Sequence, residues 1–198
     1  MIRGYFMKKE TVYKIFANMP VLETERFLLR KLSIDDTDDM YEYAKRRDVT
    51  EFLTWSPHPD KAYTLDYLLY LQNRYKTGDF FDWAIIDRES EKMIGTCGFT
   101  RFDFANNGGE VGYVINPEYY GHGIATEVAA RVIRFGFENL ALHRIECKYI
   151  VGNDASRRVM EKNGMRFEGI RRGGMLIKGE YRDIGVCSIL QEDFLKNM

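Results

Sequence analysis

The chain has 198 residues, of which 45% are hydrophobic and 30% are charged, and its formal net charge is -1. This length and composition are typical of one globular domain that is large enough to bury a proper core. The near-zero charge excludes a polybasic field, so we expect no nucleic-acid partner.

Residues 1–20 are expected to form an N-terminal extension, and residues 21–198 the single domain. ERFLLRKL at 25–32 alternates as a strand does. Ser33, with acidic residues behind it, predicts a helix start, because a capping hydroxyl and early carboxylates suit the positive end of a helix.

The next segment is EFLTWSPHPD at 51–60, whose two prolines predict a loop or a broken helix. After it, AYTLDYLLYLQNRYKTG places large side chains at helical intervals and predicts a helix that ends at Gly78. Trp83, Phe81 and the tyrosines at 63, 67 and 75 are interpreted as core residues.

Strand patterns follow. FFDWAIID and KMIGTCGFTRFDF are separated by a polar turn and predict a hairpin. The sequence NNGG at 106–109 is a tight-turn signal, since Asn and Gly accept positive φ. It leads into EVGYVIN, which would complete three consecutive antiparallel strands.

The rest of the chain alternates between helix and strand patterns. An apolar stripe from Ala125 to Leu140 predicts a helix that begins near residue 122. HRIECKYIV is a strand pattern, and NDASRRVMEKNG predicts a short helix. MLIKGEYRD and IGVCSIL predict two more strands, and Arg171 and Arg172 are expected in a solvated hairpin. The whole pattern predicts one α+β domain with a mainly antiparallel sheet.

The three cysteines, Cys97, Cys147 and Cys187, are scattered and lack CxxC spacing, which is typical of reduced structural thiols in a cytosolic protein. The histidines lack metal-ligand spacing, so we expect no metal. No apolar run is long enough to span a bilayer, and the first residues lack the apolar stretch of a signal peptide. We therefore expect a cytoplasmic protein without a membrane partner.

A turn with two glycines lies in GYVINPEYYGHGIAT at 112–126. One interpretation is that Gly121 and Gly123 only permit a tight turn. A second interpretation is a dinucleotide-binding site. Against it, Thr126 occupies the third glycine position of the G-x-G-x-x-G motif, and hairpins rather than βαβ units precede the turn. A third interpretation is a binding site for a pyrophosphate. The first N–H groups of a helix have no intrahelical acceptor, and small residues let a diphosphate approach these groups. The glycine pair alone does not decide between the first and the third.

Around this turn the sequence resembles the GNAT superfamily of acyl-CoA-dependent N-acetyltransferases. The signature Q/R-x-x-G-x-G/A is matched by YGHGIA at 120–125, with Tyr120 in the Gln/Arg position. The chain is more closely similar to the ribosomal-protein (RimJ/RimL-type) branch, through LETERFLLRKL, PEYYGHGIATE, NDASRRVMEKNGMRFEG and RDIGVCSIL in family order. The resemblance implies a GNAT fold: a mainly antiparallel mixed sheet of about six to seven strands, about four flanking helices, and splayed central strands.

The resemblance also implies how acetyl-CoA is bound. The turn would hold the pyrophosphate through its backbone, and the strand before it would bind the pantetheine arm and align the acetyl carbonyl. The helix that opens at Asn153 would contact the cofactor, although Asn is also among the best N-cap residues. The implied cofactor-binding residues are Val114, Ile115, Asn116, Tyr120, Gly121, His122, Gly123, Ile124, Ala125, Asn153 and Ser156.

Two residues are the catalytic candidates. Glu110 begins the strand EVGYVIN, where an isolated Glu is usually a solvated carboxylate, but the resemblance implies a general base there. Deprotonating an α-amine with a pKa near 8 costs about 1.4 kcal/mol at pH 7, against about 4.6 kcal/mol for a lysine. One carboxylate acting through water would therefore suffice for an α-amine. Ser156, near the cofactor sulfur by the same resemblance, would protonate the departing thiolate or donate a hydrogen bond to it.

Trp55 and His58, in TWSPHPD, are candidates for the wall of the acceptor pocket, because aromatic loops often line pockets. The alternative is that Trp55 only fills a gap beside the first helices. None of the cysteines has a His partner by spacing, so an acetyl-cysteine intermediate is not expected.

The sequence thus predicts an acyltransferase that moves the acetyl group of acetyl-CoA directly to the N-terminal α-amine of a protein, with a ribosomal protein as the acceptor that the branch implies. A small amine, such as an amino acid, a polyamine or an antibiotic, stays open as the acceptor. A non-catalytic acyl-CoA-binding module is the alternative from another class, and a NAD(P)-binding protein is more distant. The partners considered are acetyl-CoA, the amine acceptor, and a second copy of the chain in a homodimer.

Overall fold

The computed structural model describes residues 7–196. One mixed sheet of eight strands runs through this part of the chain, in the order β1-β2-β3-β4-β5-β6-β8-β7. The strands are β1 (Leu22–Glu23), β2 (Phe27–Arg30), β3 (Asp82–Asp87), β4 (Met93–Asp103), β5 (Gly108–Ile115), β6 (Arg144–Ile150), β7 (Arg166–Ile177) and β8 (Glu180–Leu190).

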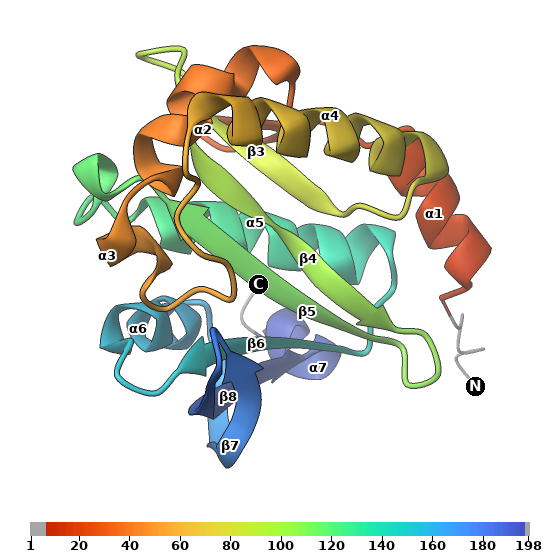
Figure 1. The fold of residues 1–198 in the computed structure, drawn as a ribbon. Coiled ribbons are helices and arrows are strands. Elements are labelled where there is room, and N and C mark those ends of the chain that lie inside the picture. The colour runs from red at the N-terminus through yellow and green to blue at the C-terminus, as the bar shows by residue number, and fades with distance from the viewer. Residues whose placement is uncertain (1–6, 197–198) are drawn as a thin grey trace.

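Helices cover both faces of the sheet (Figure 1). The α-helices are α1 (Lys9–Ala17), α2 (Thr37–Ala44), α3 (Arg47–Thr50), α4 (Lys61–Thr77), α5 (Ile124–Asn139), α6 (Asp154–Lys162) and α7 (Gln191–Lys196), and the 3-10 helices are η1 (Ile34–Asp36) and η2 (Pro117–Tyr119). In Figure 1, α2 and α4 lie in front of the sheet near β3, and α5 lies behind β4 and β5. The predicted α+β class is confirmed, with more strands and helices than expected.

The three consecutive strands predicted before the glycine turn are present as β3, β4 and β5, and each pair is antiparallel. The two asparagines of NNGG lie in the turn between β4 and β5, with Asn107 at a φ of 53°, and the two glycines are the first residues of β5. The predicted helix that ends at Gly78 is α4, which Asp60 caps through a hydrogen bond from the Tyr63 N–H. These elements follow local sequence signals closely.

Strands β5 and β6 diverge, which confirms the expected splay. They pair in parallel only where Gly108–Glu110 faces Arg144–Glu146. Beyond that point β5 pairs with β4 alone, up to Ile115, and β6 pairs with β8 alone, up to Ile150. Each strand therefore has one backbone edge without a strand partner, and the two edges face the opening between them.

Helix α5 packs behind the point of divergence. Its buried stripe includes Val128, Val132 and Ile133, as the apolar spacing predicts, although the helix begins at Ile124 rather than near 122. At Gly136 a Cβ atom would come within 2.7 Å of the Ile145 side chain. The helix thus lies close to the sheet and holds the glycine turn at the end of β5.

Part of the N-terminal segment packs into the main core. Val12 and Phe16 of α1 are fully buried, and the Phe16 ring meets the Trp83 ring edge-on at 5.3 Å between centroids. The Trp83 indole N–H donates to the Pro20 carbonyl at 2.8 Å. The predicted domain boundary at residue 20 is not tested by these contacts and stays a prediction.

The C-terminal strands differ from the predicted ones. MLIKGEYRD is not one strand, because Lys178 and Gly179, both at positive φ, turn the chain from β7 into β8. The segment around Arg171 is not a hairpin but a bulge inside β7, where the register with β8 shifts between Arg171 and Met175. Glycine pairs favour turns and bulges alike, so this sequence signal was ambiguous.

Most of the predicted core residues are buried or packed against the core. Trp83 and Tyr75 are buried, and Phe81 and Tyr67 are partly buried against them. Tyr63 is an exception, with 53% of its surface exposed, because it lies in the first turn of α4. All three cysteines are buried and unpaired.

Within residues 7–196, no helix is long and apolar enough to cross a membrane. In the same range, no three His, Cys, Asp or Glu side chains come together as a metal-binding group would require.

Candidate active site

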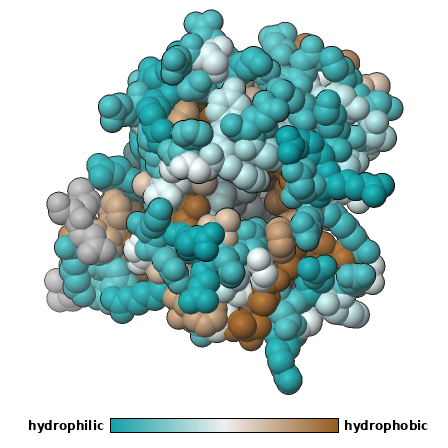
Figure 2. Space-filling model, turned by 90° about the vertical axis from the view of Figure 1, so that its left-hand side faces the viewer, coloured by the Kyte–Doolittle hydropathy of each residue, from teal (hydrophilic) through white to brown (hydrophobic). Residues whose placement is uncertain are grey.

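A cleft of about 1070 Å³ opens where β5 and β6 diverge. Residues of β5, β6, α6, the start of α5 and the loop before α4 line it. In the view of Figure 2, the middle of this face is hollowed, and hydrophobic side chains show within and below the hollow. The cleft therefore joins the glycine turn, the free edge of β5 and the predicted aromatic loop in one space.

The glycine turn forms one end of the cleft. Gly121 has a φ of 85° and Gly123 a φ of 73°, and at both positions a Cβ atom would have no other atom within 4 Å. The positive φ values explain the glycines locally. The empty space, however, shows that no neighbouring helix requires them, and the first N–H groups of α5 face an open region.

This end of the cleft fits an anionic diphosphate. Helix α5 has 16 residues, so its N-terminus combines unpaired N–H groups with roughly half a positive charge. Tyr120, Ile124 and Ala125 line the same cleft, and Arg158 and Lys162 of α6 add positive charge to its lining. The residues present therefore fit the pyrophosphate of coenzyme A.

His122 lies outside the cleft lining, although the signature includes it. Its backbone carbonyl accepts a hydrogen bond from Arg26 Nη1 at 3.0 Å. Arg26 also pairs with Glu127 in the first turn of α5, at 2.6 Å. These contacts tie the outside of the glycine turn to the chain just before β2.

The three strand residues predicted to bind the pantetheine arm are placed differently. Val114 and Ile115 line the cleft. Asn116 does not, because its side chain is buried and accepts a hydrogen bond from the Glu118 N–H at 3.1 Å. Its own N–H donates to the Ile94 carbonyl at 2.8 Å. The polar groups of Asn116 thus stabilise the start of η2.

Asn153 and Ser156 meet at the start of α6. Asn153 caps this helix by accepting a hydrogen bond from the Ser156 N–H at 3.0 Å. The Ser156 hydroxyl lies 2.9 Å from the Tyr113 hydroxyl, which is also 3.0 Å from the Ser156 carbonyl oxygen. All three residues line the cleft.

Tyr113 was not singled out by the sequence, although it sits inside EVGYVIN. Its contact with Ser156 joins β5 to α6 across the opening, between residues 43 positions apart. Burial raises the pKa of the Tyr113 hydroxyl well above its ordinary value, so the group stays protonated and can donate. No local pattern signals such a contact, and it is found only in the folded chain.

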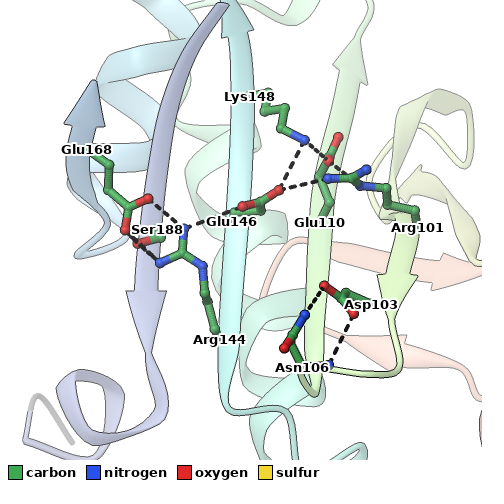
Figure 3. Close-up of polar contacts among 9 residues, drawn as sticks. All are labelled: Arg101, Asp103, Asn106, Glu110, Arg144, Glu146, Lys148, Glu168 and Ser188. Carbon is green, nitrogen blue, oxygen red and sulfur yellow. Dashed lines mark hydrogen bonds and ion pairs between the residues drawn. The ribbon is translucent and has the colours of Figure 1, made fainter. Parts of the chain in front are cut away.

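Glu110 lies at the last paired position before the strands separate. Lys148 of β6 pairs with its carboxylate at 2.5 Å, and Arg101 of β4 pairs with it at 2.8 Å. The same two cations reach Glu146, at 3.0 Å from Lys148 and 3.1 Å from Arg101 (Figure 3). Glu110 also lines the cleft. The Glu110 carboxylate therefore lies in the cleft with two positive charges paired to it.

The charge network continues away from the cleft (Figure 3). Arg144 pairs with Glu146 at 3.4 Å and with Glu168 of β7 at 2.6 Å. Hydrogen bonds from Arg144 lower the pKa of Glu168 to about 2, and the Ser188 hydroxyl adds another. These pairs link β6, β7 and β8 at the end of β6 that is still paired with β5.

The aromatic loop forms the other end of the cleft. Trp55 and His58, the candidates for the wall of the acceptor pocket, both line it. His58 is buried, with Nδ1 2.8 Å from the Thr64 hydroxyl, and burial lowers the pKa of its imidazole. Trp55 lies 5.3 Å from the His58 ring and also packs against the core. Both interpretations of Trp55 thus have contacts that support them.

Comparison with known proteins places this cleft in a family. Residues 26–166 match the family model described as "Acetyltransferase (GNAT) domain". The chain is 31% identical over 176 residues to the uncharacterized N-acetyltransferase p20 of Bacillus licheniformis, covering 89% of this chain and 99% of that protein.

Solved structures agree with this match. The ribosomal-protein-S5-alanine acetyltransferase from Vibrio fischeri is 27% identical with a TM-score of 0.71, covering 88% of this chain and 98% of that one. The spermidine N-acetyltransferase from Vibrio cholerae, solved in complex with CoA and spermine, shares the fold at 23% identity with a TM-score of 0.73, covering 87% and 99%. The family resemblance of the glycine turn and the splayed strands is confirmed, and the chain belongs to the GNAT family of N-acetyltransferases, acyltransferases that use acetyl-CoA.

Proposed function

We propose that this N-acetyltransferase acetylates the N-terminal α-amine of a protein, with a ribosomal protein as the leading acceptor. The observation that carries the site assignment is the cleft itself, which begins at an open helix N-terminus, follows the free edge of β5 and reaches Glu110. The acceptor is supported by the similarity to the Vibrio fischeri ribosomal-protein acetyltransferase. It is also supported by the low cost of deprotonating an α-amine.

Acetyl-CoA supplies the acetyl group as a thioester, with a thiol as the leaving group. The α5 N-terminus would hold its pyrophosphate, and the free backbone groups of Val114 and Ile115 would bind the pantetheine arm and polarise the carbonyl. Val114 faces Thr96 of β4 in the sheet, so its other backbone edge is available to the cleft.

Glu110 would receive the amine proton through water. Its two cationic neighbours hold the carboxylate in position, and its place beside the strand divergence gives it access to the cleft. Ser156 would donate a hydrogen bond to the departing thiolate, with the Tyr113 hydroxyl holding the Ser156 side chain in position. A thiolate with a pKa of about 8.5 leaves without much help, so this second role is the smaller one.

The test is a thiol-release assay with acetyl-CoA and a panel of acceptors. A peptide with a free N-terminus and no lysine should release thiol, whereas an N-blocked peptide that contains lysine should not. Free amino acids, polyamines and aminoglycosides complete the panel. Thiol release with a small amine alone would overturn the protein acceptor, and the lack of release with every amine would support an acyl-CoA-binding module instead.

A further inference from the structure

A second carboxylate lies in the cleft, apart from the charge network of Glu110. Asp82 is the first residue of β3, opposite Gly98 of β4. Its neighbour Trp83 points toward α5, where its ring lies 5.5 Å from that of Phe135. Because successive side chains of a strand point to opposite faces, Asp82 points toward α2 and α4. It lines the cleft together with Gly98, Tyr43 and other residues of that face.

The Asp82 carboxylate has an unusual environment. Some surface of the residue is accessible, but its Oδ1 atom is buried and has no hydrogen-bond partner. Among residues 7–196, no Lys, Arg or His lies within ion-pair distance of it. Burial raises the pKa of Asp82 to about 7, against the opposing effect of the Thr96 hydroxyl. A buried polar atom without a partner is costly, so its retention calls for a ligand.

A glycine of the neighbouring strand leaves space for this carboxylate. Gly98 and Gly112 are opposite each other in β4 and β5, in the same row as Asp82. A Cβ atom on Gly98 would lie 2.7 Å from Asp82 Oδ1, so the carboxylate occupies the space that the missing side chain leaves. Neighbouring strands are about 4.8 Å apart, which puts the β5 backbone about one strand spacing beyond Gly98. The Thr100 side chain covers Gly112, since its Cγ2 atom would lie 2.8 Å from a Cβ atom there, so a small group would reach the carboxylate from the open part of the cleft.

The groups that face Asp82 are neutral near pH 7. Tyr43 of α2, and Tyr67 and Tyr75 of α4, interact with it electrostatically, and burial raises the pKa of each of them. On α4 and the turn after it, Arg74 and Asp79 are joined to each other by an ion pair of 2.8 Å. Arg74, Lys148, Arg158 and Lys162 also line the cleft, but among the described residues none of them forms an ion pair with Asp82.

We propose that Asp82 is the residue that binds the acceptor, by pairing its buried carboxylate with the ammonium form of the amino group that is to be acetylated. This inference rests on the proposed function. An ammonium ion supplies the missing donor and the missing charge, and the aromatic rings of Tyr43 and Tyr67 suit a cation. The same carboxylate would stabilise the positive charge that develops on the nitrogen during attack. Asp82 therefore binds and orients the acceptor, and Glu110 removes its proton through water.

Asp82→Asn tests this role, since the amide keeps the shape and loses the charge. The acceptors are an alkyl amine, which stays an ammonium ion between about pH 6 and pH 8, and an aromatic amine, which is uncharged there. A charged hydrogen bond contributes enough that the KM for the alkyl amine should rise by about 10–100-fold. The KM for the aromatic amine and for acetyl-CoA should not change. The control is Asp87→Asn, at the other end of β3, where the carboxylate only accepts hydrogen bonds from Ser90.

A second measurement needs no variant. In the unaltered enzyme, the KM for the alkyl amine should rise as the pH falls below about 7, because Asp82 then becomes protonated. An unchanged KM in a folded Asp82→Asn enzyme, or a KM in the unaltered enzyme that does not depend on pH, would overturn the inference and leave the acetyltransferase intact. If no amine is acetylated at all, the proposed function fails, and calorimetry of the alkyl amine with and without Asp82→Asn still decides whether this carboxylate binds it.

Discussion

The two ends of the cleft are built from different parts of the polypeptide. At the end proposed for the cofactor, the groups expected to bind it are backbone groups: the open N-terminus of α5 beside Gly121 and Gly123, and the edge of β5 that β6 has left. At the acceptor end, the lining consists of side chains such as Asp82, Trp55 and His58, which come from β3 and the loop before α4.

This difference explains why the cofactor was easier to infer than the acceptor. Backbone groups depend on chain geometry, and one short stretch of sequence with glycines in the right places is enough to form them. Side-chain pockets depend on which residues meet from distant elements, and they can change without disturbing the fold. Substitutions at one end should therefore leave the binding measured at the other end unchanged.

The largest effect is expected at Glu110, which lies between the two ends. Glu110→Gln should lower kcat by about 10²–10⁴-fold, the usual contribution of one positioned base. The affinity for acetyl-CoA should hardly change, and a higher pH should partly restore kcat because more of the amine is then already unprotonated. Steady-state kinetics across pH, with calorimetry for the cofactor, would measure both quantities.

The matched control for this substitution is Glu146→Gln. Glu146 shares Lys148 and Arg101 with Glu110, so its loss disturbs the same charge network. It does not line the cleft, and its loss should lower kcat only slightly. A Glu110→Gln enzyme with unaltered kcat at pH 7, or an equal loss in Glu146→Gln, would end the general-base assignment.

The next effect concerns the cofactor end alone. Gly123→Val places a branched side chain where the diphosphate is expected, and forces it into a positive φ that costs about 1–2 kcal/mol of stability. The dissociation constant of acetyl-CoA should rise about tenfold or more, while the KM of the amine should not change. Calorimetry on the folded variant gives the first value.

Gly179→Val separates this binding effect from backbone strain. Gly179 has a φ of 85° and the same empty surroundings, but it lies in the turn between β7 and β8, outside the cleft lining. The Gly179→Val variant should lose about as much stability as Gly123→Val, but it should keep the affinity of the unaltered enzyme for acetyl-CoA. Equal affinities in the two folded variants would remove the pyrophosphate from the glycine turn.

A smaller effect is expected where the leaving thiolate would lie. Ser156→Ala should lower kcat by about tenfold or less, because a thiolate is already a fair leaving group. Tyr113→Phe removes the hydroxyl that contacts Ser156 and should have a smaller effect still. If kcat falls as far in Ser156→Ala as in Glu110→Gln, the ranking of these two roles is reversed.

The smallest effect is on stability at the acceptor end. The pKa of Asp82 is about 7 in the folded chain and near 4 when unfolded, so the folded state keeps a proton that the unfolded state releases. The free energy of unfolding therefore falls as the pH rises from about 4 to about 7. Asp82→Asn removes this pH-dependent loss. At pH 8 the variant should therefore have a higher free energy of unfolding than the unaltered enzyme, by at least about 1 kcal/mol, or 2–4 °C in Tm. Equal Tm differences at pH 4 and pH 8 would show that the carboxylate is not perturbed.

The parts of the molecule that follow from neighbouring residues could be predicted from the sequence. Both ends of helix α4 are marked by local capping residues, Asp60 and Gly78. The signature for cofactor binding is likewise one continuous segment of sequence. The contacts of Tyr113 with Ser156, and of Asp82 with Gly98, join residues that come together only in the folded sheet. The predicted hairpin near Arg171 and the predicted core position of Tyr63 were wrong for the same reason, since both features depend on what packs nearby.

Helix α1 affects how the domain can be shortened. The family match begins at residue 26, yet Phe16 fills space against Trp83, and a Cβ atom at Gly78 would lie 1.8 Å from the Tyr13 carbonyl oxygen. A protein trimmed to the family boundary would uncover an aromatic surface beside β3, the strand that begins with Asp82. We expect such a shortened enzyme to aggregate during production, and any change in acceptor preference that it shows would come from a disturbed β3.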